Sequence, residues 1–218
     1  MNGLIEVYDR LTDRLRSAGD WVAPLGLRLL LGYEFLSAGL RKAGAEGVPG
    51  WFADKGFPPP FDWFPAGMNW AMVTWTEVLA AIALMLGLFT RFVAFSLFMV
   101  TTIAIVSTHW PSDWSSLSEL WKGYAVSNEG FGNYRIPLLF MAMLLPLVFM
   151  GGGKLSVDHV LVKLGGRADL VDTRRDDLLA LALALLVPGI ALVYLIPLWG
   201  ALLIVAAALT AFAHSLRG

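Results

Sequence analysis

The chain has 218 residues, of which 57% are hydrophobic and 15% are charged, with a net charge of −1 and no cysteine. The near-neutral charge gives no bulk attraction to nucleic acid, so no nucleic-acid partner is expected. The lack of cysteine excludes disulfides, thiol–quinone relay chemistry and cysteine-ligated metals.

Residues 4–18 are predicted to form an amphipathic helix ahead of the first long apolar run. Leu4, Tyr8, Leu11 and Leu15 recur at helical spacing, with charged residues opposite them. The pattern is typical of a helix lying in the membrane interface, and a short soluble helix packed on the protein has the same pattern. Residues 1–20 mix acids and bases and are not a secretory signal.

Long apolar runs dominate the rest of the sequence. A membrane-spanning helix needs about 20 residues at 1.5 Å rise each, and lipid requires every backbone group to be bonded internally. We count six such runs, at 21–41, 69–88, 91–110, 134–150, 178–196 and 198–214. They predict an all-α polytopic membrane bundle. Its expected parts are an interfacial segment (1–20), a four-span bundle (21–160), a basic loop (161–177) and a transmembrane hairpin (178–218).

Aromatic residues gather in the loop at 42–67, which also carries three consecutive prolines, and in the loop at 111–133. Because two spans separate these loops, they are expected on the same membrane face, as an aromatic lid or as an ordinary interfacial belt. Ser116 and Glu119 fit a capping box for a short helix. Valine and leucine spacing predicts a second short helix after the glycines at 151–153.

The distribution of Lys and Arg predicts the orientation. With the N-terminus inside, ten bases are cytoplasmic: Arg10, Arg14, Arg16, Arg91, Lys154, Lys163, Arg167, Arg174, Arg175 and Arg217. Five are then external: Arg41, Lys42, Lys55, Lys122 and Arg135. We therefore expect a multi-pass protein of the inner (plasma) membrane, surrounded by lipid, with both termini in the cytoplasm.

Three charged residues, Arg28, Glu34 and Glu77, interrupt the first two apolar runs. A charge in hydrocarbon costs roughly 2.5–3.5 kcal/mol on insertion scales, so such residues face partners, cavities or ligands. Helical rise places Arg28 roughly 10 Å, Glu77 roughly 16 Å and Glu34 roughly 20 Å from the inner face. An Arg28–Glu77 pair is therefore predicted, either as a structural salt bridge or as a pocket for a polar or anionic ligand.

Around the first span, Arg28 shares a stripe with Gly32, Phe35 and Gly39, and small residues there let another helix approach closely. Glu34 lies about 120° away, on another wall. A cationic, aromatic outer mouth is expected from the residues near the outer span ends, namely Arg41, Lys42, His109, Trp110 and Arg135. His109 has a pKa near 6.5 when unperturbed and is interpreted as a proton-handling group, a donor to a quinone carbonyl, or a solvated interfacial side chain.

Several short motifs in this order resemble the DoxX family of bacterial and archaeal membrane proteins, which includes the small subunit of thiosulfate:quinone oxidoreductase. They are Arg28 to Phe35 with Gly39 to Lys42, the aromatic run Trp51 to Pro58, Glu77 with the turn Leu86 to Arg91, His109, and Gly151 to Asp158. The resemblance covers about residues 22–160. The C-terminal hairpin lies beyond the family's four-span unit, and the Trp-rich third loop is long for the family.

The resemblance implies a membrane subunit of a quinone-linked oxidoreductase, with electron transfer from sulfur compounds or in stress responses, and with protein partner subunits. Glu77, His109 and Glu34 are then the candidate catalytic residues, and the candidate substrate-binding residues are Arg28, Lys42, Arg91, Trp110 and Arg135. Quinone is the expected cofactor, and nothing in the sequence indicates a metal or flavin site. The alternatives are a non-catalytic accessory or anchoring subunit and, less strongly supported, a carrier for a small anion.

Overall fold

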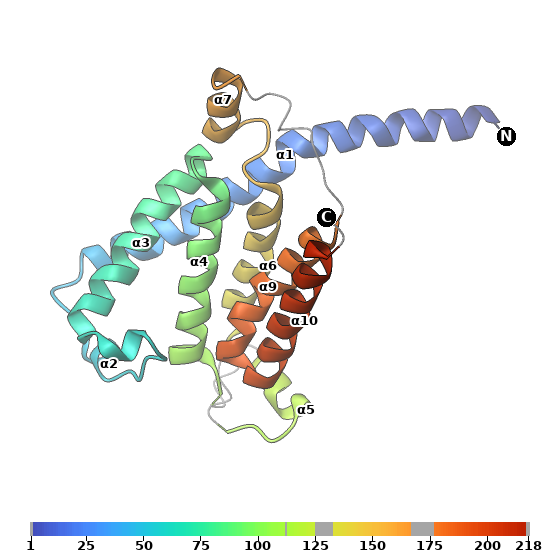
Figure 1. The fold of residues 1–218 in the computed structure, drawn as a ribbon. Helices are drawn as coiled ribbons and strands as arrows, with labels where there is room; N and C mark the ends of the chain where they lie inside the picture. The colour runs from blue at the N-terminus through green and yellow to red at the C-terminus, as the bar shows by residue number, and fades with distance from the viewer. Residues whose placement is uncertain (1, 112, 125–132, 167–176, 217–218) are drawn as a thin grey trace. The chain divides into compact units, whose positions relative to one another are not determined.

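The computed structural model describes residues 2–111, 113–124, 133–166 and 177–216, and every regular element in those ranges is a helix. The all-α prediction is confirmed. The long helices are α1 (Asn2–Ala43), α3 (Ala66–Leu86), α4 (Thr90–Ala104), α6 (Arg135–Met150), α9 (Leu178–Leu195) and α10 (Pro197–Ser215) (Figure 1). The short ones are α2 (Gly50–Ala53), η1 (Phe61–Trp63), the π-helical η2 (Ile105–His109), α5 (Leu117–Leu120), η3 (Trp121–Tyr124) and α7 (Val157–Leu164). Arg167, Arg174, Arg175 and Arg217 lie outside the described residues.

Four helical segments are long and apolar enough to cross a membrane, at Ala66–Leu86, Thr90–His109, Leu178–Leu195 and Pro197–Ser215. They match four of the six predicted spans. The predicted fourth span corresponds to α6, whose 16 residues make a shorter apolar helix. The predicted first span is the C-terminal half of α1. The chain is therefore a helical membrane protein.

α1 differs from the prediction because it is one uninterrupted helix of 42 residues, with no end between the interfacial segment and the first span. Pro24 lies inside it and has no N–H for the carbonyl of Asp20, four residues earlier. That carbonyl instead accepts the backbone N–H of Lys154 at 3.2 Å. The replacement bond allows the helix to continue through the proline.

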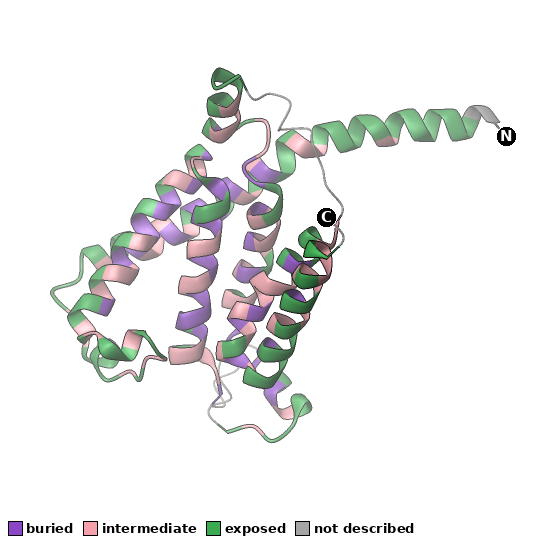
Figure 2. Cartoon of the chain, in the orientation of Figure 1, coloured by how far each residue is buried: buried purple, intermediate pink, exposed green. Residues whose placement is uncertain are grey.

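Two compact units make up the chain. The first comprises Met1–Pro49, Gly67–Phe98 and Phe140–Val171, and the second comprises Gly50–Ala66, Met99–Leu139 and Asp172–Gly218. The first unit holds α1, α3, α7 and parts of α4 and α6. The second holds α2, η1, η2, α5, η3 and the hairpin of α9 and α10. Figure 2 shows buried residues concentrated on single faces of α3 and α4, whereas α10 is mostly exposed.

In the first unit, α1 packs against α3 through the predicted glycine stripe. A Cβ at Gly39 would lie 2.7 Å from Val78 Cγ2, and one at Gly32 would lie 2.5 Å from Met85 Cγ. Phe35, on the same stripe, is buried, and its ring centroid lies 5.7 Å from that of Phe140 of α6. The stripe therefore forms the contact face of α1, as predicted.

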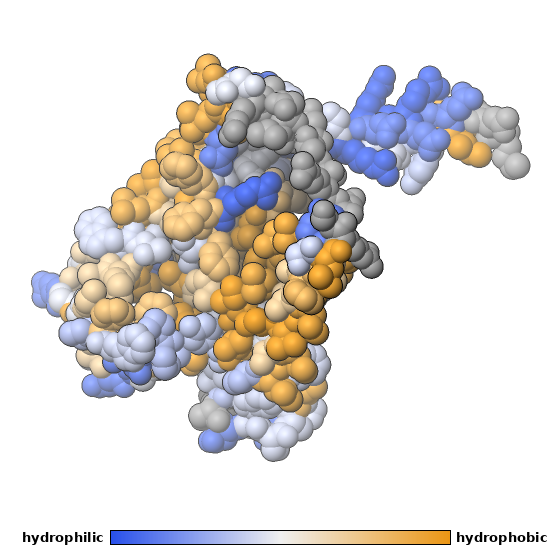
Figure 3. All heavy atoms as spheres, in the orientation of Figure 1, coloured by the Kyte–Doolittle hydropathy of each residue, from blue (hydrophilic) through white to orange (hydrophobic). Residues whose placement is uncertain are grey.

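In the second unit, α9 and α10 form the predicted hairpin, and Pro197 is the first residue of α10. Only 22% of the residues in the apolar stretch of α9 and 11% of those in α10 are buried, against 39% in α3. Figure 3 shows hydrophobic residues over much of the face of this pair that is turned to the viewer. Gly200 is buried against the backbone of Leu192 and Val193, so the two helices meet at backbone distance.

Replacing Gly200 with Ala is expected to separate α9 from α10, because the new Cβ would collide with the backbone at Val193. Backbone atoms cannot move aside without shifting a helix. The free energy of unfolding is therefore expected to fall by about 1–3 kcal/mol, as for other overpacked sites. Thermal unfolding in detergent measures it. Gly26→Ala in α1 is the matched control, because no heavy atom lies within 4 Å of its added Cβ. Equal melting temperatures for the two variants would contradict this packing.

Candidate functional site

Arg28 is fully buried in the first unit, beside the turn that joins α3 to α4. Its Nη2 donates to the carbonyl of Leu155, and the carboxylate of Asp158 attracts the guanidinium. Nε and Nη1 are buried, and no described residue is a hydrogen-bond partner for either of them. A Cβ at Gly87 would overlap Nη1, so the guanidinium occupies the space that a side chain at position 87 would fill.

Asp158, in the first turn of α7, connects that helix to the same turn. Its two carboxylate oxygens accept the backbone N–H groups of Phe89 (2.7 Å) and Thr90 (2.8 Å), and its own N–H donates to the carbonyl of Gly87 (2.9 Å). A carboxylate there satisfies the free N–H groups at the start of α4 and interacts favourably with its dipole. Ser156, two residues earlier, caps α7. We refer to Arg28, Gly87, Thr90, Ser156 and Asp158 as the turn cluster.

Arg91 lies in the first turn of α4, and its guanidinium reaches the end of α6. It donates to the carbonyls of Val148 (3.1 Å), Phe149 and Met150 (3.3 Å). These are carbonyls of the last helical turn, which have no partner within the helix. Arg91 was predicted to bind substrate, and in the structure its donors are engaged in capping α6.

The predicted Arg28–Glu77 pair is wrong. Arg28 lies beside Gly87, which follows Glu77 by ten residues, or about 15 Å of helical rise. The depth estimate assumed that the first span begins level with the end of α3, at Trp21. In the structure α3 ends level with Arg28 instead. The register of α1 against α3 therefore differs from the expected one by seven residues.

Glu77 pairs with Lys42 instead, at the other end of the α1–α3 contact. Lys42 Nζ lies 2.5 Å from Glu77 Oε2, with side chains 23% and 9% exposed, respectively. The side chain of Glu77 contacts α1 at Gly39, and the guanidinium of Arg41 also attracts its carboxylate. The pairing lowers the cost of burying both charges.

Thr74 is a further buried polar residue of α3, three positions before Glu77 in the sequence. Thr74 is 3% exposed, and its Oγ1 has no hydrogen-bond partner within the described part of the chain. Thr74 precedes Glu77 by three residues, so the two share one helix face. Glu34 is half-buried on another face of α1. Lys42 was predicted to lie in the cationic outer mouth. Thr74 was not predicted as a site residue, because a threonine in an apolar helix does not by itself indicate a site.

The second unit holds the remaining predicted site residues. His109 ends η2 and is half-buried, and its carbonyl accepts the N–H of Asn133 at 3.2 Å. The ring centroid of Trp110 lies 5.0 Å from that of Tyr134, whose hydroxyl donates to the carbonyl of Leu120. Arg135 is exposed, with Cζ 5.3 Å from the centre of the Tyr124 ring. His109, Trp110 and Arg135 therefore belong to one unit, whereas Arg41 and Lys42 belong to the other.

The predicted Ser116 cap is confirmed, and the Glu119 carboxylate bonds to Ser115 in place of Ser116. Ser116 is the N-cap of α5 and accepts the N–H of Glu119, and the Glu119 carboxylate accepts the backbone N–H (3.0 Å) and hydroxyl (2.8 Å) of Ser115. These bonds from Ser115, first the backbone one, hold the pKa of Glu119 below its ordinary value. Among the described residues, no group of three His, Asp or Glu side chains is placed to hold a metal.

Comparison with known proteins identifies the family. The DoxX family matches residues 23–110, which include Arg28, Lys42, Glu77 and the α3–α4 turn. An uncharacterized protein of Haemophilus influenzae (strain Rd) is 34% identical over 152 residues, which cover 69% of this chain and 90% of the relative. The chain belongs to the DoxX family. No solved structure matches this DoxX protein.

Substitution of Gly87 by Ala tests the turn cluster. Position 87 has φ +69°, which disfavours any side chain, and the new Cβ would overlap Arg28 Nη1. Both effects predict a large loss of thermal stability in detergent. Gly47→Ala is the control, because position 47 also has a positive φ (+85°) but no heavy atom lies within 4 Å of its Cβ. A similar loss in both variants would show that backbone conformation alone explains the effect and that the Arg28 contact does not.

The Glu119 cap predicts a local pH dependence. Because the pKa of Glu119 is lowered on folding, its stabilisation of α5 is complete above the ordinary carboxyl pKa of about 4.3 and is lost as pH falls through the lowered value. Hydrogen exchange at the backbone amides of Ser115 and Glu119 is expected to accelerate over that acidic range beyond its intrinsic pH dependence. Glu119→Gln is expected to remove the transition. A transition of unchanged size in Glu119→Gln would contradict the assignment.

Proposed function

We propose that this DoxX protein is an integral membrane subunit of a quinone-linked oxidoreductase, with the quinone headgroup beside the Lys42–Glu77 pair. The observation that carries the proposal is the buried pair itself, at the contact between two helices that family membership places in a membrane protein. Buried ionisable residues in such helices mark ligand and proton pathways. The turn cluster is a poorer candidate, because Arg28 is enclosed by the α3–α4 turn and the glycine-rich segment.

The residues fit a quinone headgroup, which has two carbonyl oxygens and an apolar ring. An ammonium has three N–H donors, and Lys42 uses one of them for Glu77. Another is available for a quinone carbonyl. The buried hydroxyl of Thr74, on the face of α3 that carries Glu77, has no hydrogen-bond partner among the described residues and is a candidate second donor.

When bound, a quinone accepts two electrons and two protons. Lys42 holds the headgroup by a charge-assisted hydrogen bond. Glu77 accepts a hydrogen bond from Lys42 as a carboxylate; it would first take up a proton from solvent and then give that proton to the reduced quinone oxygen. The electrons would come from a reduced sulfur compound or from a partner subunit.

The lysine and arginine distribution also supports placement in the inner membrane with both termini in the cytoplasm. Arg10, Arg14 and Arg16, all on the N-terminal part of α1, are on the side predicted to be cytoplasmic. The Lys42–Glu77 pair is then in the outer half of the first two spans.

A second function, a non-catalytic anchoring subunit, is favoured by the hairpin of α9 and α10. Only 11% of the residues in the apolar stretch of α10 are buried. Large apolar side chains such as Trp199 and Phe212 are exposed there. Lipid covers such a surface, and so do the helices of another membrane subunit. An anchoring subunit predicts partner proteins after gentle extraction and no quinone binding that depends on Lys42.

The Lys42–Glu77 pair is tested by comparing single and double variants. Lys42→Met alone leaves a buried carboxylate unpaired, which costs about 3–5 kcal/mol in comparable cases, whereas replacing both partners with apolar residues is often neutral. Lys42→Met/Glu77→Leu is therefore expected to fold with near-native stability. Its affinity for a short-chain quinone is expected to fall about tenfold, the loss of one hydrogen bond to a charged donor.

Quenching of tryptophan fluorescence measures the affinity. Lys154→Met is the matched control, because it also removes a lysine from an ion pair (Lys154 Nζ to Asp20 Oδ2, 3.7 Å). Native quinone affinity in a folded Lys42→Met/Glu77→Leu protein would overturn the assignment of the quinone to this pair.

A further inference from the structure

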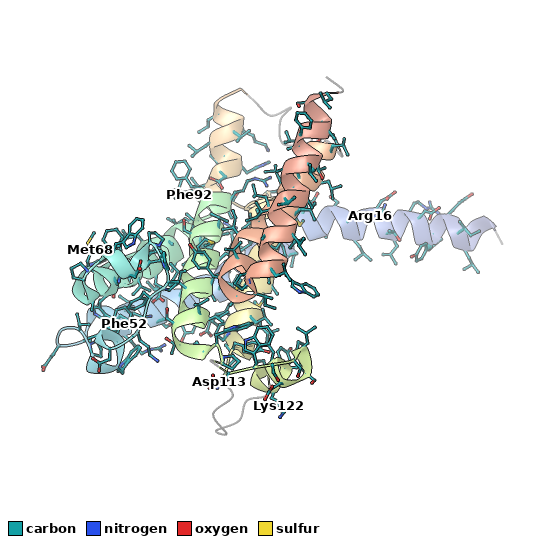
Figure 4. The ribbon with its side chains drawn as sticks, turned by 60° about the horizontal axis from the view of Figure 1, so that its bottom comes forward. Arg16, Phe52, Met68, Phe92, Asp113 and Lys122 are labelled. Carbon is teal, nitrogen blue, oxygen red and sulfur yellow. The ribbon has the colours of Figure 1, made fainter. Side chains whose placement is uncertain are left out.

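The first half of α1 carries an apolar surface that its own unit leaves exposed. Leu4 is 81% exposed, Tyr8 68%, Leu11 54% and Leu15 62%. A helix that packed on the other helices of this unit would bury this face, so these residues do not pack on the first unit. Figure 4 shows Arg16 on the part of α1 that extends beyond the other helices of its unit.

The two faces of this segment separate cleanly at 100° per residue. The apolar arc covers about 160° and contains Leu4, Ile5, Val7, Tyr8, Leu11, Thr12, Leu15 and Ala18. The opposite arc contains Glu6, Asp9, Arg10, Asp13, Arg14, Arg16, Ser17 and Asp20. No charged side chain lies inside the apolar arc.

The junction with the membrane-embedded half of α1 suits a change of direction. Pro24 removes one helical hydrogen bond, and helices bend at such positions. The carbonyl of Asp20 that it releases is bound by the N–H of Lys154. Trp21, 44% exposed, lies beside the Lys154 ammonium, whose Nζ is 6.0 Å from the ring centre. Tryptophan and lysine are the residues typical of the membrane–water boundary.

We propose that α1 bends near Pro24 and that residues 4–20 lie along the lipid headgroups, with the apolar arc toward the acyl chains and Trp21 and Lys154 at the junction. A second copy of the chain is the competing occupant. A coiled-coil seam uses two positions in seven and places charges beside them, whereas this arc is about 160° wide and Ile5, Val7 and Thr12 occupy the flanking positions. Width and charge placement therefore favour a bilayer surface.

The charge balance defines which lipid is needed. The segment holds three bases (Arg10, Arg14, Arg16) and four acids (Glu6, Asp9, Asp13, Asp20), so attraction to anionic headgroups is not required. A zwitterionic bilayer is sufficient, and binding depends on the apolar area of the helix.

The chain has no cysteine, so single labels can be introduced without other changes. Full-length Leu11→Cys and Asp13→Cys proteins, each carrying a nitroxide, are placed in phosphatidylcholine nanodiscs. Paramagnetic resonance then measures collision with oxygen, which concentrates in lipid, and with a water-soluble nickel chelate. The ratio of oxygen to nickel accessibility is expected to be several-fold higher at position 11 than at position 13. Asp9→Cys is the second label on the polar face.

Two outcomes would overturn the proposal. Equal nickel accessibility at positions 11 and 13 would place the helix in water. Protection of position 11 from both reagents, with dipolar broadening between labels, would place a second copy of the chain on the apolar arc. Neither outcome depends on quinone binding, so the result is independent of the proposed function.

Discussion

The guanidinium of Arg28 is buried in the first unit, away from bulk water. The backbone around it holds it in place. The missing side chain of Gly87 makes room for Nη1, the carbonyl of Leu155 accepts from Nη2, and Asp158 supplies the opposite charge. Asp158 also caps α4 at Phe89 and Thr90. One buried charge thus ties together α1, the α3–α4 turn and the segment before α7, and the register of α1 on α3 depends on that connection.

That register assigns different roles to charges that look alike in the sequence. With Arg28 beside Gly87, Glu77 is about 15 Å along α3 and lies beside Lys42 instead. The end of the contact near Arg28 is closed by interactions with backbone groups. At the other end a lysine with spare donors adjoins a carboxylate. The proposed quinone site therefore rests on Lys42 and Glu77, and Arg28 positions the helices that carry them.

The fold was largely predictable, because apolar runs of this length can only be helices in lipid, and the Gly32–Gly39 stripe and the Ser116 cap follow from spacing alone. The true partners of Arg28 and Glu77 could not be predicted, because helical rise gives the relative depth of two residues only if the ends of their helices are level. Nothing in the sequence shows that α1 continues through Pro24. The role of Asp158 also depends on a tertiary contact. A pattern of residues predicts a helix face, but the offset between two faces is decided by their packing.

We expect ligand binding at the Lys42 end of the α1–α3 contact and not at the Arg28 end. A photoreactive short-chain quinone, cross-linked to the protein in membranes and mapped by mass spectrometry, tests it most directly. We expect labelled residues around Gly39 to Lys42 and Thr74 to Val78, with competition by unmodified quinone. Competed labelling confined to the residues around Arg28 and Gly87, with none near Lys42, would contradict it.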